Sequence, residues 1–239
     1  MKNLERTNTR EASSIRETSV ITDFCKNSYS SVLISMGDTR VICAASIDTD
    51  VPEFAKNKNI GWLTAEYTML PYSTPRRTRR ELMKRDGRSV EIQRLIGRSL
   101  RAGIDLGRFQ GHSMFIDCDV IQADGGTRTA SITGGFIAMK LATDRMLREG
   151  LIVENPITGN IAAISVGIVD NEILLDLDFS EDSRADVDMN IVMNSSFELI
   201  EIQGTGEQAP FSVNTMNSMV ETAGKGIAEL INIQNSCFK

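Results

Sequence analysis

The amino-acid sequence predicts a single α+β domain with mixed sheets packed against helices, and three observations support this. The chain has 239 residues and 26.3 kDa, enough for one large domain or two small ones. Some segments alternate apolar and polar residues, which is typical of strands, while others place apolar residues at helical spacing. No internal repeat, low-complexity run or linker divides the chain. We therefore expect residues 1–239 to form one domain.

The same periodicities place the individual elements. Strand-like alternation occurs in 30–47 (turning at Gly37-Asp38), 64–70, 114–120, 161–169, 172–179, 188–193 and 197–203. Apolar residues recur at helical spacing in three segments: 89–104, about 127–148, and a last segment that begins near Ser212. Ser212 is a candidate N-cap of that last helix. Segment 71–87 is polar and lacks periodicity, so we expect a mobile basic loop there.

Arginines concentrate in one segment of an otherwise acidic chain. The formal net charge is −6, which by itself argues against a nucleic-acid partner. Segment 76–108, however, holds eleven basic and four acidic residues, so it carries +7 and leaves −13 on the rest. Ten of the eleven bases are arginine, which suits phosphate recognition, whereas lysine would serve a solvated face equally well. The bias favours a nucleic-acid partner.

Cysteine usage and the polar N-terminus predict a soluble cytoplasmic protein. None of the four cysteines forms a close pair such as CxxC, and Cys43 and Cys118 lie in apolar runs typical of reduced core residues. Residues 1–19 contain no apolar stretch of the signal-peptide type. The sequence contains no run of about 18 apolar residues, so it predicts no membrane-spanning helix.

The inventory of reactive side chains excludes several kinds of site. His112 is the single histidine, so paired-histidine mechanisms and histidine zinc sites are excluded, and a Ser-His-Asp triad would depend on that residue alone. The cysteine spacing argues against a cysteine zinc site. Carboxylates, arginines and glycines remain, which is the inventory of metal-assisted phosphoryl transfer.

A glycine turn before a helix is the strongest local signal. The turn Asp124-Gly125-Gly126 follows a predicted strand, and Thr127-Arg128-Thr129 opens the predicted helix. Backbone N–H groups at a helix N-terminus attract anions, and an arginine adds a planar fork for phosphate oxygens. Glycines between a strand and a helix usually only make the turn, so this motif alone leaves both interpretations open.

An acidic segment is the second signal. Segment 176–188 holds six acids in thirteen residues, which could be a solvated loop. Asp176 and Asp178 alternate with leucines, however, and Asp188 opens the apolar run 191–193, so the acids are expected at strand ends. Hard carboxylate oxygens held in this way suit Mg²⁺.

Five longer motifs resemble the ribonuclease PH family, whose members are phosphate-dependent exoribonucleases that trim tRNA 3′ ends. They occur in the family's order between about residues 30 and 235: GWLTAEYTMLP (61–71), GRSVEIQRLIGR (87–98), the strand-turn-helix segment 114–136, EDS to DMN (181–190) and EIQGTGE (201–207). The resemblance implies the fold shared with ribosomal protein S5 domain 2.

The resemblance also assigns roles to individual residues. It implies phosphate binding by Arg88, Gly126, Thr127 and Arg128. It implies catalytic or metal-binding roles for Asp182 and Asp188, with Mg²⁺ as cofactor and inorganic phosphate as co-substrate. The expected products are a nucleoside 5′-diphosphate and an RNA shorter by one residue, in a reversible reaction on tRNA precursors and possibly rRNA.

The chain departs from the family pattern outside these motifs. The family usually opens with Arg-x-Asp-Gly-Arg and then Leu-Arg-Pro, where this chain has Leu4-Glu5-Arg6 and Ile15-Arg16-Glu17. Tyr72 stands where the family carries arginine after Met-Leu-Pro. These differences are expected to affect RNA binding and the contacts between subunits. The catalytic motifs are intact.

The family implies a ring-shaped homo-oligomer, a hexamer built as a trimer of dimers. Several copies of the +7 segment around a ring would together create a strong positive electrostatic potential that attracts tRNA. Arg77 and Arg80 are the candidates for RNA binding, and Arg94, Arg98 and Arg101 are candidates for subunit contacts or for lining the site.

Three functions are therefore weighed. The favoured one is a phosphorolytic 3′-to-5′ exoribonuclease, that is, a tRNA nucleotidyltransferase. The first alternative is a non-catalytic RNA-binding ring subunit of an exosome-like assembly, against which the joint presence of Arg88, Arg128, Asp182 and Asp188 argues. The second is a hydrolytic Mg²⁺ nuclease, which would release nucleoside monophosphates.

Overall fold

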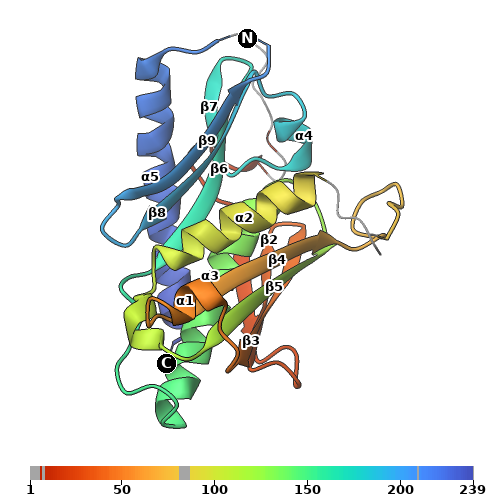
Figure 1. Cartoon of the computed structure of the whole chain (residues 1–239). Coiled ribbons are helices and arrows are strands. Elements are labelled where there is room, and N and C mark those ends of the chain that lie inside the picture. The colour runs from red at the N-terminus through yellow and green to blue at the C-terminus, as the bar shows by residue number, and fades with distance from the viewer. Residues whose placement is uncertain (1–5, 7–8, 81–86, 209, 239) are drawn as a thin grey trace.

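The chain forms two β-sheets and three long helices (Figure 1). The computed structural model describes residues 6, 9–80, 87–208 and 210–238. The predicted α+β class is confirmed. Segment 81–86 of the expected mobile basic loop lies outside the described residues.

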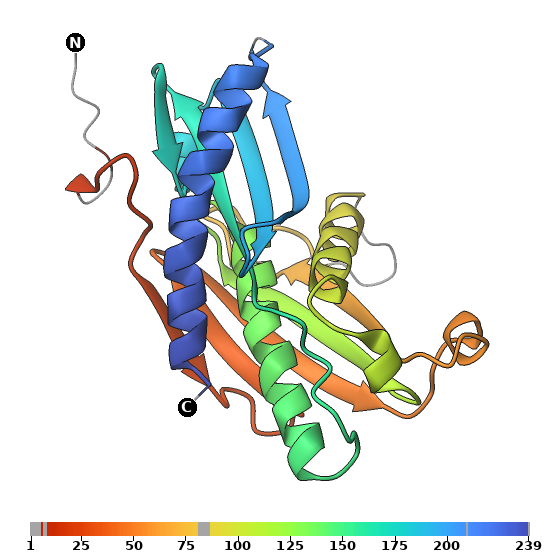
Figure 2. The same ribbon diagram turned by 90° about the vertical axis from the view of Figure 1, so that its left-hand side faces the viewer.

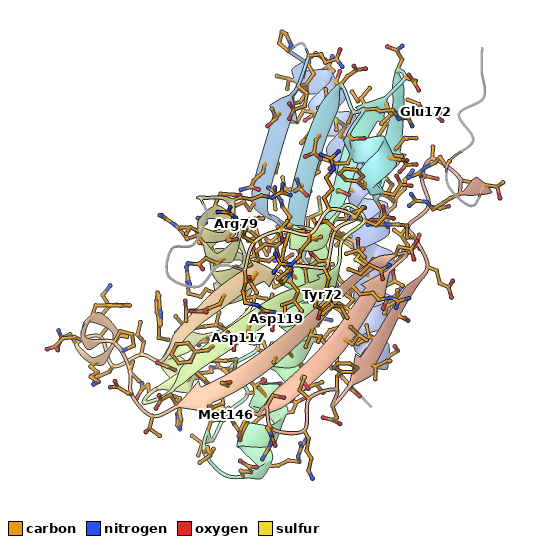
Figure 3. All side chains as sticks on the ribbon, turned by 90° about the vertical axis from the view of Figure 1, so that its right-hand side faces the viewer. Tyr72, Arg79, Asp117, Asp119, Met146 and Glu172 are labelled. Carbon is orange, nitrogen blue, oxygen red and sulfur yellow. The ribbon has the colours of Figure 1, made fainter. Side chains whose placement is uncertain are left out.

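The first sheet has five strands in the order β1-β2-β3-β5-β4, of which only the β4–β5 pair is parallel. Its strands are β1 (Thr18–Thr22), β2 (Ser30–Met36), β3 (Thr39–Asp48), β4 (Trp62–Met69) and β5 (Ser113–Gln122). Side chains alternate through the middle of β5, where Ile116, Cys118 and Val120 are buried and Phe115 faces solvent. Figure 3 shows Asp117 and Asp119 on the same outward-facing side of this sheet.

The second sheet has four antiparallel strands in the order β7-β6-β8-β9. They are β6 (Ile161–Val169), β7 (Glu172–Leu175), β8 (Val187–Asn194) and β9 (Leu199–Gly206). The expected strand 172–179 is too long, because Asp176 adopts a left-handed φ of +55° that ends β7. The remainder of that segment leads into a short helix.

The helices cover the sheets and join them. They are α1 (Glu53–Lys56), α2 (Gly87–Arg101), α3 (Thr127–Arg148), α4 (Phe179–Asp182) and α5 (Val213–Ser236), with a short 3₁₀ turn at Leu106–Phe109. Ser212 caps α5 as predicted, since its hydroxyl accepts a hydrogen bond from the Thr215 amide. Figure 2 shows α3 and α5 lying across the same side of the molecule.

Helix α3 is the centre of the fold. It packs against strands of both sheets and is buried on nearly every face of its first four turns. Gly134 permits this approach, because a Cβ there would lie 2.7 Å from Ile34 Cγ2 and 2.9 Å from Cys43 Sγ. One hydrophobic core therefore runs from the first sheet through α3 to the second sheet and α5. The N-terminus of α3 is thereby fixed at the junction of the two sheets.

None of the helices in the described part of the chain combines the length and apolar character needed to cross a membrane.

Candidate active site

A cavity of about 540 Å³ lies at the N-terminus of α3, and residues from both sheets line it. This volume is typical of a small-ligand site. The cavity brings together all six residues expected to bind phosphate or act in catalysis: Arg88, Gly126, Thr127, Arg128, Asp182 and Asp188. They come from α2, from the start of α3, and from the neighbouring elements α4 and β8, which form three separate regions of the sequence.

The glycine turn supplies an open helix N-terminus to this cavity. Gly125 and Gly126 both have left-handed φ angles, +73° and +64°. A Cβ on Gly125 would lie 2.5 Å from the carbonyl oxygen of Leu177, so this position excludes any side chain. Gly126 is the N-cap of α3 and offers no side chain to the first amides of the helix. Backbone N–H groups at such a helix N-terminus attract anions.

Two hydroxyl groups hold the turn in place. The Thr39 hydroxyl donates a hydrogen bond to the Gly125 carbonyl at 2.6 Å and accepts one from the Asp124 amide at 3.0 Å. The hydroxyl groups of Tyr67 and Thr127 are hydrogen bonded at 2.9 Å. Burial raises the pKa of Tyr67, so its hydroxyl stays protonated at neutral pH.

Two arginines border the turn. Arg88 lies in the first turn of α2, exposed to solvent and to the cavity. Arg128 is half-buried, and its Nη1 donates to Gln203 Oε1 at 3.0 Å and lies 3.8 Å from Glu91 Oε2. Gln203 Nε2 in turn donates to Glu91 Oε1 at 2.8 Å. This network orients the Arg128 guanidinium toward the cavity without a close bidentate ion pair that would occupy it.

Two acids line the same cavity. Asp182 ends α4, whose geometry is fixed by a capping box between Asp178 and Glu181. Asp182 is accessible to solvent, yet partial desolvation raises its carboxyl pKa, while Arg128 and Arg88 act in the opposite direction. The site therefore combines two acids with two arginines that influence them electrostatically.

Asp188 is the most perturbed acid of the site. Burial, followed by repulsion from Asp182, raises the pKa of Asp188 to about 6. Its Oδ1 is buried without a hydrogen-bond partner among the described residues, and Asn190 Nδ2 lies 3.5 Å from its Oδ2. An unsatisfied buried carboxylate oxygen is destabilising, and such a perturbation in a cavity is typical of a functional residue.

Comparison with known proteins agrees with this geometry. Family models described as "3′ exoribonuclease family, domain 1" and "domain 2" match residues 14–143 and 159–226. Ribonuclease PH of Neisseria meningitidis serogroup C is 52% identical over 231 residues, covering 96% of both chains. Ribonuclease PH of Crocosphaera subtropica is 47% identical over 234 residues, covering 98% of both.

The chain belongs to the ribonuclease PH family. The activity is that of a phosphorolytic 3′-to-5′ exoribonuclease, or tRNA nucleotidyltransferase, as predicted from the motifs. The alternative of a non-catalytic exosome-like subunit has less support, because the relatives at about 50% identity are the ribonucleases PH.

Solved structures share this fold at low identity. Rice (Oryza sativa) Rrp46 has a TM-score of 0.79 at 16% identity, covering 98% of this chain and 100% of that chain. A chain of the Archaeoglobus fulgidus exosome with RNA bound to the active site has a TM-score of 0.81 at 20% identity, with coverages of 97% and 93%. These similarities confirm the ribonuclease PH type of fold.

The predicted RNA-binding arginines lie outside the cavity of this ribonuclease PH relative. Arg77 and Arg80 are exposed in the loop that follows β4, whereas their neighbour Arg76 lines the cavity. Figure 3 shows Arg79 of the same loop, and Tyr72 before it, near the junction of the two sheets. The loop therefore extends from the cavity outward, with Tyr72 exposed to solvent.

Arg94, Arg98 and Arg101 line a separate, smaller cavity of about 180 Å³ along α2. Arg98 forms an ion pair with Glu201 of β9. Arg101 stacks 4.8 Å from the Trp62 ring centroid and donates to the Leu63 carbonyl at 3.0 Å. At least two of the three therefore stabilise the position of α2 within the chain.

Sequence reasoning missed several residues that line or support the cavity. Arg76, Ser165 and Asn190 line it, and Thr39 and Tyr67 hold the turn. Conversely, part of the acidic segment is structural, since Asp178 and Glu181 form the capping box of α4. The spacing Asp-x-x-Glu is a readable signal for that role. No comparable signal marks the others, because tertiary contacts determine their position.

Proposed function

We propose that Arg88, Gly126, Thr127 and Arg128 bind the inorganic phosphate, and that Asp182 and Asp188 act on the departing end of the RNA. The observation that carries this proposal is the cavity that two arginines, an open helix N-terminus and two acids line together. Free phosphate is a poor nucleophile toward another phosphate group, because both are negatively charged. The arginines and backbone N–H groups neutralise and orient it.

The reaction forms one bond and breaks one bond at the same phosphorus. A phosphate oxygen attacks the last internucleotide phosphorus, and the bond from that phosphorus to the 3′ oxygen of the preceding nucleotide breaks. The terminal nucleotide leaves as a 5′-diphosphate, and the 3′ oxygen takes up a proton. Burial and repulsion from Asp182 raise the pKa of Asp188 in the metal-free protein, so a carboxyl of this pair that does not ligate a metal can supply that proton. Both bonds are phosphate ester or anhydride linkages, so the reaction is reversible.

The acid pair also fits Mg²⁺ as the cofactor. The buried Oδ1 of Asp188 has no partner among the described residues, and Asp182 raises the pKa of the Asp188 carboxyl by repulsion. In the described part of the chain, no three acidic, histidine or cysteine side chains cluster as a complete ligand set. Magnesium typically takes one or two carboxylates and completes its shell with water and substrate oxygens. A bound Mg²⁺ would supply positive charge that stabilises the leaving 3′ oxygen.

The direct test is the phosphate dependence of RNA shortening. We expect shortening to stop when inorganic phosphate is omitted and to resume when phosphate is restored. We also expect nucleoside diphosphates to extend the same RNA in the reverse direction. Gel analysis of an end-labelled RNA measures both, and an unchanged rate of shortening without phosphate would contradict the proposed site.

The proposed natural substrates are the 3′ ends of tRNA precursors, with rRNA 3′ ends as a second class, processed in the cytoplasm. All four cysteines are free thiols, which agrees with that compartment. We further propose that residues 1–239 behave as one domain, since the core is continuous through both sheets.

A ring-shaped homohexamer, built as a trimer of dimers, is the proposed assembly. Edge strand β9 and its hairpin expose apolar side chains, including Phe197, Leu199 and Ile202. Exposed apolar groups along a sheet edge favour burial against another chain. Light scattering should give a mass near six times 26.3 kDa, and a stable monomer with full activity on tRNA would contradict the assembly.

Arg77 and Arg80 are proposed to hold the body of long RNA. Arg77→Ala combined with Arg80→Ala should weaken tRNA binding and reduce its dependence on salt. For each arginine–phosphate contact that is lost, tRNA binding releases about one counterion fewer. The measurement is tRNA affinity across a salt series. Cleavage of a very short oligonucleotide should be almost unchanged.

The matched control removes two exposed charges elsewhere, as Lys56→Ala with Lys58→Ala on and just after α1. It should leave the salt dependence of tRNA binding as in the wild type. Equal losses on short and long substrates in the Arg77 and Arg80 variant would instead place these arginines in the active site or the fold.

A further inference from the structure

The N-terminal segment delivers three arginines to two buried carboxylates. Arg6, Arg10 and Arg16 contact Asp176 and Glu181, whose side chains are 0% and 2% exposed. Arg6 and Arg10 both reach Glu181, whereas Arg16 is paired with Asp176 alone. Of the atypical opening Leu4-Glu5-Arg6, the first two residues lie outside the described part of the chain. The described arginines turn inward, so they are part of the fold.

Arg16 connects this cluster to the phosphate turn. Its Nε and Nη2 donate to the two oxygens of Asp176 at 3.0 and 2.7 Å, and its backbone amide donates to Oδ2 at 2.7 Å. The third nitrogen, Nη1, donates to the carbonyl oxygen of Asp124 at 2.6 Å. Asp176 itself is anchored, because its amide donates to the Ser165 carbonyl at 2.7 Å. The guanidinium is thus a rigid bridge from β6 and β7 to the turn.

This bridge determines where the amides of the turn point. In a trans peptide the N–H lies opposite the C=O, so fixing a carbonyl also fixes the next amide. Arg16 holds the Asp124 carbonyl and Thr39 holds the Gly125 carbonyl. The paired amides belong to Gly125 and Gly126, which both line the cavity. Neither amide donates a hydrogen bond to another described residue.

The packing around Arg16 leaves it little freedom. The side chain is 7% exposed and passes between two glycines with positive φ. A Cβ on Gly37 would lie 2.8 Å from Arg16 Cδ, and a Cβ on Gly126 would lie 2.9 Å from Arg16 Nη2. Arg16 is not among the residues that line the described cavity, so it acts on a ligand only through the turn.

We infer that Arg16 is a positioning residue for phosphate. It orients the Gly125 amide through the Asp124 carbonyl, and its Nη2, which lies 3.5 Å from the Gly125 carbonyl oxygen, supports Thr39 in orienting the Gly126 amide. The inference rests on the proposed phosphate site. Arg16 stands at the arginine of the family's Leu-Arg-Pro, so this role belongs to the part of that pattern that the chain keeps.

The test compares Arg16→Met and Arg16→Lys with wild type in steady-state phosphorolysis. We expect Arg16→Met to raise the KM for inorganic phosphate roughly tenfold to a hundredfold, because the amides lose their preset direction, and to leave the KM for RNA within about twofold. Lysine keeps the charge beside Asp176 but lacks the fork that reaches Asp124 as well, so Arg16→Lys should give an intermediate KM for phosphate.

Arg10→Met is the matched control. Arg10 contacts the same two carboxylates, at 3.6 and 3.2 Å, but does not bond to the turn. Its loss should change stability while leaving the KM for phosphate within about twofold. A second readout is the rise in melting temperature that added phosphate produces relative to chloride at equal ionic strength. This rise should be large in wild type and Arg10→Met and small in both Arg16 variants.

The outcomes separate this inference from the site on which it rests. If wild-type enzyme consumes phosphate and a folded Arg16 variant keeps the wild-type KM and thermal shift, the inference is wrong and the site stands. The same holds if Arg10→Met raises the KM for phosphate as much as Arg16→Met. If Arg16→Met does not fold, Arg16→Lys decides between these results. If the wild-type enzyme shortens RNA without phosphate, the proposed phosphate site is wrong, and the inference about Arg16 is wrong with it.

Discussion

Asp188→Asn is expected to reduce phosphorolysis on the order of a thousandfold or more, equivalent to about 4 kcal/mol of transition-state stabilisation. The amide lacks the negative charge that would hold Mg²⁺ and cannot deliver a proton. Because asparagine has nearly the same shape, the fold should be retained, as judged by circular dichroism. Single-turnover rates at saturating phosphate measure the effect.

The matched control for this substitution is Asp186→Asn. Asp186 lies two residues earlier, just before β8, and is not among the residues lining the described cavity. This variant should retain activity close to wild type. If Asp188→Asn keeps its Mg²⁺-dependent activity, the metal and proton roles belong elsewhere in the acidic segment.

The same substitution should stabilise the metal-free protein at higher pH. Folding raises the pKa of Asp188 from an ordinary 3.8 to about 6, so the folded state binds this proton more tightly than the unfolded chain. Stability is therefore lost as pH rises from about 4 to 6, by roughly 1–3 kcal/mol, and stays lost above pH 6. Urea unfolding should show Asp188→Asn more stable than wild type at pH 8, with the difference vanishing near pH 4.

Arg128→Ala should lower the rate of phosphate use by about a hundredfold or more while changing RNA affinity far less. One charge-assisted contact in a preorganised site contributes on the order of 2–4 kcal/mol to the transition state. The expected signature is a fall in kcat/KM for phosphate, measured at saturating RNA. RNA affinity is measured separately by filter binding without phosphate.

Arg145→Ala provides the control on the same helix. Arg145 lies near the opposite end of α3 and pairs with Glu149 at the surface. Its removal should leave kcat/KM for phosphate unchanged. Near-normal phosphorolysis in Arg128→Ala would remove this residue from the phosphate site.

The elements that the sequence predicts well are those whose pattern is local. The helix expected over about 127–148 is α3, Thr127–Arg148, because its boundaries are a glycine turn and a polar end. Strand β1, Thr18–Thr22, has no expected counterpart, since five residues at a sheet edge show little alternation. β7 ends at Asp176, which has a left-handed φ and is hydrogen bonded to Arg16, 160 residues away, and no local pattern reveals this contact.

The candidate site shows the same division. The family motifs predict the six residues that the cavity brings together, although the roles proposed for them are still predictions. The supporting roles of Thr39, Tyr67 and Arg16 were not predicted, because each acts through hydrogen bonds to residues far away in the sequence. The acidic segment illustrates the ambiguity of composition. Its carboxylates divide into structural groups such as Glu181 and cavity groups such as Asp188, and only the fold separates them.

The most direct test of phosphate as the attacking group follows the label from radioactive inorganic phosphate during RNA shortening. Phosphorolysis predicts that the label appears as the terminal phosphate of the released nucleoside diphosphates, one labelled diphosphate for each nucleotide removed. Chromatography of the products with standards for mono- and diphosphates reads this out. Release of unlabelled nucleoside monophosphates at the same rate would show that water is the nucleophile and would contradict the account.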